Sequence, residues 1–238
     1  MTVISIAGLK VGLDHKYDYT AGVVRDYLGE GDADFSVSAT DEQIELERRM
    51  SSEEYPVGYL ENIVLYRNIA EILPEYSAVV FHGAVIAVDG VAYAITAHSG
   101  VGKTTHIRLW LKTLGERAHV LNGDKPVFRI IDGKVYACGT PWRGKEGYGR
   151  SEMLPLGGIA FLERSEKNFA VPVSSGQVLS RFITQAYVPR RPDNARRALG
   201  VLSGILASVP LIRLGANMQD EAAEIAYRAM SEQYEKNN

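Results

Sequence analysis

The sequence has little of what marks several classes of protein. Among its 238 residues there is a single cysteine, Cys138, which excludes an intrachain disulfide and a cysteine-rich zinc site. Positive charge is not in excess, because 26 Lys and Arg face 29 Asp and Glu, for a formal net charge of −3. Such a chain lacks the excess of positive charge that binds nucleic acid or an anionic membrane surface non-specifically. We therefore expect neither of them as a partner.

Long apolar runs are also missing. The longest one, residues 78–96, is broken by His82, Asp89 and two glycines, so it cannot span a bilayer. The first ten residues do not combine a basic segment with a following apolar one, and we expect no signal peptide and a cytoplasmic location. What is present, 46% apolar and 23% charged residues, is typical of a folded chain of one or two domains.

Residues 1–56 are predicted to be rich in strands. Residues 35–39 alternate apolar and polar side chains, which is the period of a half-buried strand, and the charged segment 41–54 is expected at the surface. A helix follows and ends at Pro74. Its predicted apolar stripe consists of Tyr59, Ile63, Tyr66, Ala70 and Leu73.

The rest of the chain mixes strands and helices. Residues 78–96 and 127–138 are each predicted to form a hairpin, with Asp89-Gly90 and Asp132-Gly133 as tight turns. Further strands are predicted at 119–121, toward the end of 151–161 and at 211–214, and helices from Lys103 to Gly115 and at 174–186, 193–208 and 218–230. This order indicates an α/β fold, which we divide into a strand-rich lobe with a helix, residues 1–75, and a larger domain, residues 76–238.

One motif carries chemistry. The segment Ala97-His-Ser-Gly-Val-Gly-Lys-Thr104 matches the phosphate-binding loop pattern except that Ala97 replaces its first glycine. The predicted strand before it and the predicted helix after it supply the context that the motif requires. Glycines let successive backbone N–H groups turn toward a phosphate, and the helix N-terminus adds positive potential. The predicted nucleotide-binding residues are Ser99, Gly100, Val101, Gly102, Lys103, Thr104 and Thr105.

The motif also predicts individual roles. Lys103 would reach the β- and γ-phosphate oxygens, and the Thr104 hydroxyl would bind Mg²⁺. Asp124, which follows the predicted strand 119–121, is the candidate for the second metal ligand, although an aspartate in Asn-Gly-Asp-Lys-Pro is also an ordinary turn residue. His82 lies within an apolar run, where a histidine is by default a hydrogen-bonded core residue.

Two further segments are candidates for anion contacts. Residues 140–149 combine glycine, tryptophan and positive charge after a strand, so Arg143 and Lys145 are predicted to clamp the substrate or the γ-phosphate; the alternative is an exposed loop. Residues 189–197 contain a basic cluster, interpreted either as a solvated helix start or as a contact between subunits.

The central residues resemble the HPr kinase/phosphorylase family and its relative, phosphoenolpyruvate carboxykinase. The resemblance rests on His82-Gly83, on the loop ending Lys103-Thr104-Thr105 and on residues 122–124, and it covers roughly residues 79–163. It implies a nucleotide-binding α/β core of that type, with ATP and Mg²⁺ as cofactors, and a homo-oligomer. The strand-rich N-terminal lobe and the C-terminal helices are predicted from the residue patterns alone, because the segment before residue 78 does not match the family's N-terminal domain.

The chain departs from the family at position 123, and it has no stretch that matches the family's later signature, although residues 140–149 lie in that region. HPr kinases carry two consecutive aspartates, of which the first is the base and the second serves the metal, whereas this chain has Gly123-Asp124. Asp124 therefore matches the metal aspartate, and His82 becomes the candidate base because a neutral imidazole can take a proton near pH 7. HPr itself is not expected as the substrate.

These observations predict an ATP-dependent kinase that transfers the γ-phosphoryl group to a hydroxyl of a peptide, a protein or a small molecule, with Lys103, Asp124 and His82 as catalytic residues. The alternative is an ATP-binding sensor or assembly factor without transferase activity, which the missing aspartate favours. A carboxykinase would need a larger apparatus than 238 residues supply. The choice between ATP and GTP and the identity of the acceptor stay open.

Overall fold

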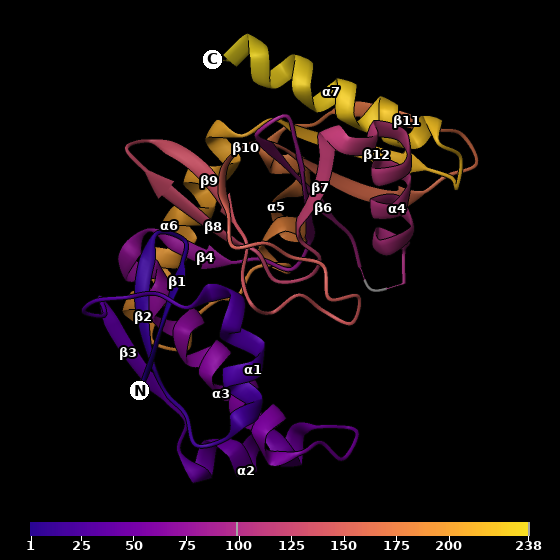
Figure 1. The fold of residues 1–238 in the computed structure, drawn as a ribbon. Coiled ribbons are helices and arrows are strands. Elements are labelled where there is room, and N and C mark those ends of the chain that lie inside the picture. Colours follow the sequence, from indigo (N-terminus) through magenta and orange to yellow (C-terminus); the bar gives the residue numbers. More distant parts are fainter. Residues whose placement is uncertain (99, 238) are drawn as a thin grey trace.

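The structure, a computed structural model, describes residues 1–98 and 100–237. It shows a mixed α/β fold with a small N-terminal lobe and a larger lobe built on a nine-stranded sheet (Figure 1). In the part of the chain that is described, no helix is long and apolar enough to cross a membrane.

The N-terminal lobe combines a three-stranded sheet, in the order β1-β2-β3, with helices. Its elements are β1 (Thr2–Ile6), β2 (Leu9–Asp14), α1 (Asp18–Val24), η1 (Arg25–Tyr27), β3 (Phe35–Ser38), α2 (Asp41–Met50), α3 (Val57–Ile72) and η2 (Leu73–Tyr76). The strand-rich prediction for residues 1–56 therefore missed two helices. For α2 a local signal exists, because Thr40 and Gln43 form a capping box, with the Gln43 N–H donating to Thr40 Oγ1 at 3.2 Å.

The helix α3 is buried on more than one side, which the single predicted stripe did not anticipate. Its buried apolar residues are Leu60, Val64, Leu65, Ile69 and Ala70. The fully buried carboxylate of Glu61 accepts hydrogen bonds from the backbone N–H of Lys16 at 2.6 Å and from the Thr20 hydroxyl at 3.1 Å. A buried charge is tolerated when its hydrogen-bonding capacity is used in this way, and here it attaches α1 to α3.

The larger lobe has its strands in the order β4-β8-β9-β10-β6-β5-β7, with β12 beside β10 and β11 at the edge beside β12. Its elements are β4 (Ala78–Val80), β5 (Ala84–Val88), β6 (Val91–Thr96), α4 (Lys103–Leu114), η3 (Gly115–Arg117), β7 (Ala118–Asn122), β8 (Val127–Ile131), β9 (Lys134–Cys138), β10 (Met153–Arg164), β11 (Phe169–Pro172), α5 (Ser175–Ile183), α6 (Pro192–Ser208), β12 (Leu211–Ala216) and α7 (Glu221–Asn237). The strand β11 was not predicted.

Both predicted hairpin turns are confirmed. Asp89 and Gly90 have φ angles of 49° and 82°, and Asp132 and Gly133 have 49° and 76°. Two successive residues with positive φ are what a two-residue turn needs to match the twist of its strands. The first run, however, is not one strand before its turn: it is divided into β4 and β5, and His82 lies at the break.

The strand directions bring the candidate site residues to one edge. β10 runs parallel to β6 and β12, and β7 has the same direction as β6 because both are antiparallel to β5. The carboxyl ends of β6, β7 and β10 therefore lie at the same edge of the sheet, and the chain enters β5 there. Ligands of open α/β sheets bind outside such an edge.

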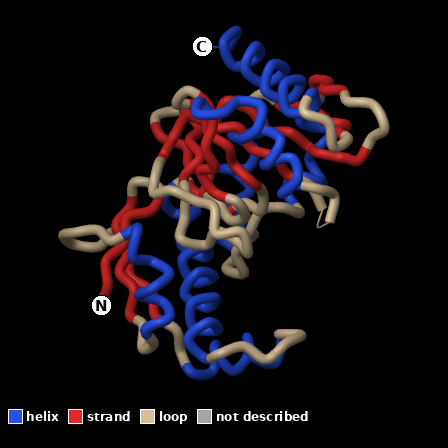
Figure 2. The backbone as a smooth tube through the Cα atoms, turned by 45° about the vertical axis from the view of Figure 1, so that its right-hand side comes forward, coloured by secondary structure: helices blue, strands red, loops and turns tan. Residues whose placement is uncertain are grey.

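Helices cover both faces of the large sheet. One face packs against α5 and α6 through residues such as Phe161 and Phe182, and the other packs against α4 and α7 through Trp110 and Met230. The N-terminal lobe shares its core with the large lobe, because buried Cys138 of β9 packs among its residues. Figure 2 shows the large lobe above the N-terminal lobe, with loops between them. The division at residue 75/76 stays a prediction.

Candidate functional site

The segment from the end of β6 into the first turn of α4, residues 97–104, is called the 97–104 loop below. Gly100 and Gly102 have φ angles of 78° and 124°, which residues with a side chain rarely adopt. A Cβ atom added at either glycine would meet no described heavy atom within 4 Å. Glycine is therefore needed at both positions because of the positive φ angle and not because a side chain would collide with a neighbour. The space above both glycines is open. Ser99, also predicted to bind nucleotide, lies outside the described residues.

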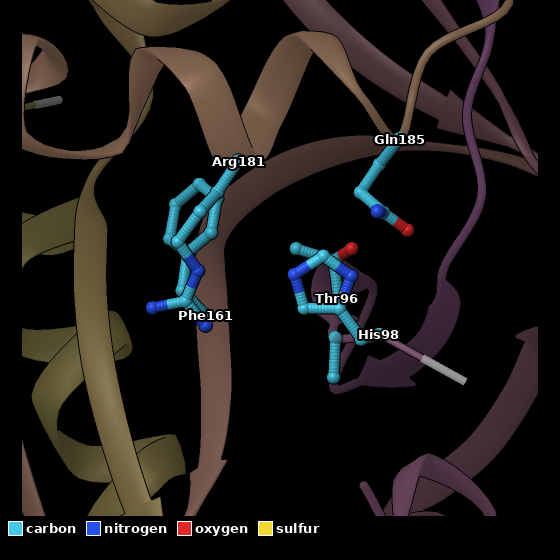
Figure 3. Close-up of a pocket in the computed structure, with 6 residues that line it drawn as sticks. Thr96, His98, Phe161, Arg181 and Gln185 are labelled. Atoms are coloured by element: carbon cyan, nitrogen blue, oxygen red, sulfur yellow. The ribbon is translucent and has the colours of Figure 1, made fainter. Parts of the chain in front are cut away.

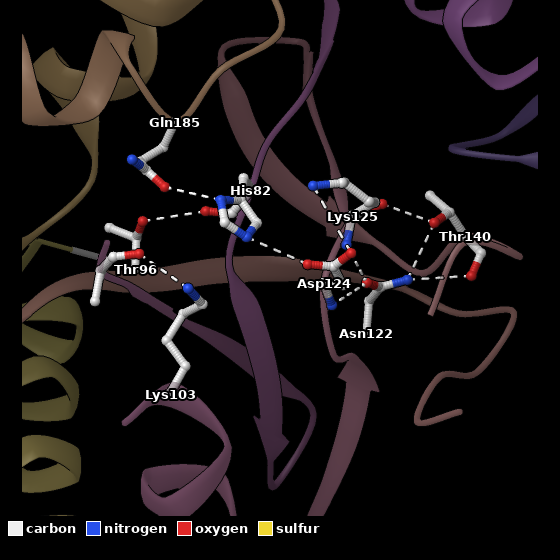
Figure 4. A network of polar contacts seen from close by, with 9 residues as sticks. His82, Thr96, Lys103, Asn122, Asp124, Lys125, Thr140 and Gln185 are labelled. Atoms are coloured by element: carbon white, nitrogen blue, oxygen red, sulfur yellow. Dashed lines mark hydrogen bonds and ion pairs between the residues drawn. The ribbon is translucent and has the colours of Figure 1, made fainter. Parts of the chain in front are cut away.

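Lys103 begins α4, as the motif requires, and its side chain turns back over the loop. The Nζ atom donates to the backbone oxygen of Ala97 at 2.9 Å (Figure 4). Partial burial lowers the pKa of Lys103 below its usual value, with a smaller effect of Lys125, while the charge of Asp124 acts in the opposite direction. Thr104 is half-buried beside it and Thr105 is exposed.

Asp124 is held in place by its own turn. The buried side-chain oxygen of Asn122 accepts the backbone N–H groups of Asp124 at 2.9 Å and of Lys125 at 2.7 Å. The Asn122 amide donates to the hydroxyl and the backbone oxygen of Thr140, at 3.0 and 3.1 Å. Asn122 ends β7, so this turn fixes Asp124 at the edge where the 97–104 loop lies.

The carboxylate of Asp124 faces positive and polar groups. Its Oδ1 lies 3.3 Å from Nε2 of His82 and its Oδ2 lies 3.7 Å from Nζ of Lys125. Burial by itself would raise the pKa of Asp124, but the hydrogen bond from His82 and the charges of Lys125 and Lys103 outweigh it and hold the pKa below its usual value. Asp124 is therefore an anion at neutral pH.

His82 is engaged at both ring nitrogens. Besides the contact with Asp124, its Nδ1 lies 3.0 Å from Oε1 of Gln185, and its backbone N–H donates to the backbone oxygen of Gln185 at 2.6 Å. His82 is half-exposed, not enclosed in a core strand. A general base needs a ring nitrogen with a free lone pair, so His82 can act as one only when Gln185 or Asp124 releases it.

The position of the missing base aspartate is covered by another segment. A Cβ atom at Gly123 would lie 3.1 Å from the backbone oxygen of Arg143, and the N–H of Gly123 donates to the backbone oxygen of Tyr148 at 3.0 Å. Gly144, with a φ angle of 74°, approaches so closely that a Cβ atom there would lie 2.9 Å from Cβ of Asp124. Residues 140–149 thus pack on the Asp124 turn where a side chain at position 123 would emerge.

The same segment contacts the N-terminal lobe. Arg143 donates to Oδ2 of Asp26 at 2.7 Å, and its guanidinium lies 5.4 Å from the ring centre of Tyr27. Trp142 packs against Tyr66 of α3 with 4.9 Å between ring centres. Lys145 is exposed. The clamping roles of Arg143 and Lys145 stay predictions, and for Arg143 that role requires breaking the ion pair with Asp26.

The basic cluster at residues 189–197 marks the start of α6. The backbone N–H of Arg190 donates to the carboxylate of Glu71, and Arg196 pairs with Asp193 at 2.9 Å in an exposed position. These contacts are those of a helix start at the surface. The role of this cluster between subunits stays a prediction.

Three residues near the loop were not predicted from the sequence. Gln185 and Arg181 line a small pocket together with His98 and Thr96 of the loop region (Figure 3). Arg164, the last residue of β10, donates from Nη2 to the backbone oxygen of Gly100 at 2.6 Å. All three come from segments far from the motif in the chain, and no sequence pattern links them to it.

The donors suit a divalent cation held together with phosphates, and not one held by protein alone. In the described residues no group of three His, Cys, Asp or Glu side chains could hold a metal ion. Mg²⁺ at nucleotide sites takes one or two protein oxygens and completes its shell with phosphate oxygens and water. Asp124 is an anion and Thr104 is half-buried, so both offer the kind of oxygen that Mg²⁺ takes at such sites, and their binding of Mg²⁺ stays a prediction.

The comparisons with known proteins do not assign a family. No protein-family model matches the chain, and no curated protein matches it. Among solved structures, the Hpr(Ser) kinase/phosphatase from Coxiella burnetii matches with 8% sequence identity and a TM-score of 0.39, covering 67% of this chain and 99% of that one. A similarity of this degree assigns no activity to the chain.

Proposed function

We propose that the protein binds ATP at the 97–104 loop and transfers the γ-phosphoryl group to a hydroxyl acceptor. The observation that carries this proposal is the placement of Lys103 and Asp124 at one sheet edge, beside two open glycines with positive φ. An ammonium, a carboxylate and a glycine-rich turn at a helix N-terminus are the groups that phosphoryl transfer requires, because the reaction depends on charge neutralisation and positioning.

Each group has a part in binding. The backbone N–H groups of the loop and of the first turn of α4 face the phosphates, and Lys103 exchanges its bond with the Ala97 oxygen for the β- and γ-phosphate oxygens. Asp124 and Thr104 would hold Mg²⁺, which when bound would supply positive charge to the phosphates. The open space over Gly100 and Gly102 leaves room for the phosphate chain.

The transfer step forms one bond and breaks one. The acceptor oxygen bonds to the γ-phosphorus while the bond to the bridging oxygen breaks, and ADP leaves with that electron pair. The acceptor loses its proton to the His82–Asp124 pair when Gln185 releases Nδ1 of His82. In a loose transition state the acceptor hydroxyl needs little help from a base. A histidine that is hydrogen-bonded to Gln185 and Asp124 for part of the time therefore slows the reaction without preventing it.

Two observations favour a second candidate, an ATP-binding sensor without transferase activity. Residues 140–149 fill the space beside Gly123, and both nitrogens of His82 are occupied, so no base is free. In a sensor, ATP binding at Lys103 and Asp124 would displace the residues that pack on the Asp124 turn. The two candidates differ in whether ADP is released.

The test is a calorimetric titration of the protein with Mg-ATP, followed by an assay of the same sample for ADP. The wild type should bind, and slow ADP release, with water as the acceptor, supports the kinase. Lys103→Ala should weaken binding roughly tenfold to a hundredfold, since a hydrogen bond to a charged group contributes about 1.5–3 kcal/mol. Lys112→Ala on the same helix, which removes an exposed ion pair with Asp220, is the matched control.

Three outcomes are decisive. Equal affinity of the wild type and Lys103→Ala would contradict the proposed site, as would the absence of binding by the wild type. Binding with ATP left intact, also in the presence of hydroxyl acceptors, would select the sensor.

A further inference from the structure

A second groove lies between α5 and the sheet, next to the candidate site. It has a volume of about 480 Å³, within the range of small-molecule sites. Its lining residues come from three neighbouring strands of the sheet, β10, β12 and β11, from Val173 just after β11, and from α5. Its charged residues are Glu163, Arg181 and Arg213, and its apolar residues include Val171, Pro172 and Val178. We call it the Arg181–Arg213 groove.

The groove carries net positive charge. The carboxylate of Glu163 lies 3.6 Å from Arg181 and 3.7 Å from Arg213, so one anion faces two guanidinium groups. Both distances are longer than a good hydrogen bond. N–H groups of the two arginines are therefore still available to bind another anion. Their side chains are 34% and 50% exposed and can be reached from solvent.

The two guanidinium groups are held by aromatic rings. Arg181 lies 5.6 Å from the ring centre of Phe161, and Arg213 lies 5.2 Å from that of Phe169. Stacking on a ring restricts an arginine while its N–H edge stays available. The cationic end of the groove is therefore organised before any ligand enters.

The groove adjoins a small pocket at the 97–104 loop. Arg181 also lines the small pocket whose other residues include Ala97 and His98 of that loop, as Figure 3 shows for Arg181 and His98. Arg181 thus belongs to both cavities, so a molecule that contacts Arg181 from the groove lies next to the pocket at the 97–104 loop. On the far side, exposed Val171 offers an apolar surface.

We propose that the Arg181–Arg213 groove binds the phosphoryl acceptor, and that this acceptor is a small organic anion that carries both a hydroxyl and an apolar group. Its carboxylate pairs with Arg213 and Arg181, its apolar part packs on Val171 and Val178, and its hydroxyl points toward the 97–104 loop. This inference rests on the proposed function. It deepens that function, because it replaces an unspecified hydroxyl by a hydroxy acid.

The test uses 3-hydroxyoctanoate as the probe and its uncharged methyl ester as the matched control ligand, titrated into the full chain with and without Mg-ATP. The acid should bind the wild type about tenfold more tightly than the ester, and Arg213→Gln should abolish that preference. Arg213→Lys keeps the positive charge but loses the two parallel N–H donors of the guanidinium group. Its preference for the acid over the ester should therefore lie between those of the wild type and Arg213→Gln. Arg228→Gln, an exposed arginine on α7, should behave as the wild type. The acid should also increase ADP release.

The outcomes separate the groove from the proposed function. Equal binding of acid and ester, or an acid preference that survives Arg213→Gln, would overturn the anion site. A fall in ATP affinity with Arg213→Gln, at unchanged acid affinity, would assign the groove to the nucleotide and overturn the inference. Acid binding without faster ADP release would overturn the acceptor role. Failure of the wild type to bind Mg-ATP, with acid preference intact, would instead contradict the proposed function.

Discussion

Arg143 and Asp26 join the two lobes of the molecule: Nη2 of Arg143 donates to Oδ2 of Asp26 at 2.7 Å, across 117 positions of the chain. The contact lowers the pKa of Asp26, chiefly through this hydrogen bond. Because the backbone of Arg143 also covers Gly123, the N-terminal lobe is connected through one residue to the turn that carries Asp124.

This contact predicts that Asp26→Asn loosens residues 140–149. Without the carboxylate, Arg143 loses its charged partner, and local opening of the segment becomes more frequent. Limited trypsin digestion should cut after Arg143 and Lys145 about fivefold faster in Asp26→Asn than in the wild type, as read by mass spectrometry. Asp193→Asn, which breaks another exposed ion pair far along the chain, is the control. Identical digestion rates would show that Trp142 and the Gly123 contacts hold the segment without Asp26.

Arg164 is predicted to shape the 97–104 loop. Its guanidinium donates to the backbone oxygens of Gly100 at 2.6 Å and Val101 at 3.4 Å, which turns those carbonyls toward β10. Peptide groups held by their oxygens leave their N–H groups for the other side, where phosphate would bind. Arg164→Ala should weaken Mg-ATP binding about tenfold, and Arg164→Lys should restore part of it.

The control for that measurement is Arg49→Ala, an exposed arginine on α2 in the N-terminal lobe. It removes the same charge without touching the loop. If Arg164→Ala and Arg49→Ala have the same affinity for Mg-ATP as the wild type, the loop keeps its shape without Arg164.

Cys138 is predicted to be unreactive until the shared core opens. Its thiol is fully buried, and burial raises its pKa to about 12. At about pH 8 the folded protein therefore has neither access nor thiolate, and a thiol reagent such as dithionitrobenzoate should react roughly a hundredfold more slowly than with the denatured chain.

The sign of the pH effect follows from the same shift. The unfolded thiol ionises above about pH 9 while the folded one stays protonated, so the contribution of Cys138 to stability is complete below that pH and falls as the pH rises. If Cys138 of the native protein reacted with the thiol reagent as fast as Cys138 of the denatured chain, the core around β9 would have to open separately from the rest of the fold.

The sequence by itself determined the local parts of the candidate site. Glycines at 100 and 102, an apolar strand before them and a helical period from Lys103 are near neighbours in the chain, and the structure has β6, a turn with positive φ and α4 at these positions. The hairpin turns at 89–90 and 132–133 were predictable for the same reason, since Asp-Gly sets its own backbone conformation. Helix α2 shows the limit, because its capping residues Thr40 and Gln43 are a local helix signal, whereas the high charge of the segment is equally typical of an exposed loop.

The tertiary structure alone decided what each site residue contacts. His82 contacts Gln185, which is 103 positions away in the chain, and Arg143 contacts Asp26 instead of open solvent. Glu163 lies between Arg181 of a helix and Arg213 of a strand. Periodicity records which face of an element is apolar, but it does not record which distant element covers that face. The lobe contact and the groove therefore arise from the order of strands in the sheet and from the packing of α5 and the N-terminal lobe against it, because a side chain's partners depend on elements that the chain brings together only when it folds.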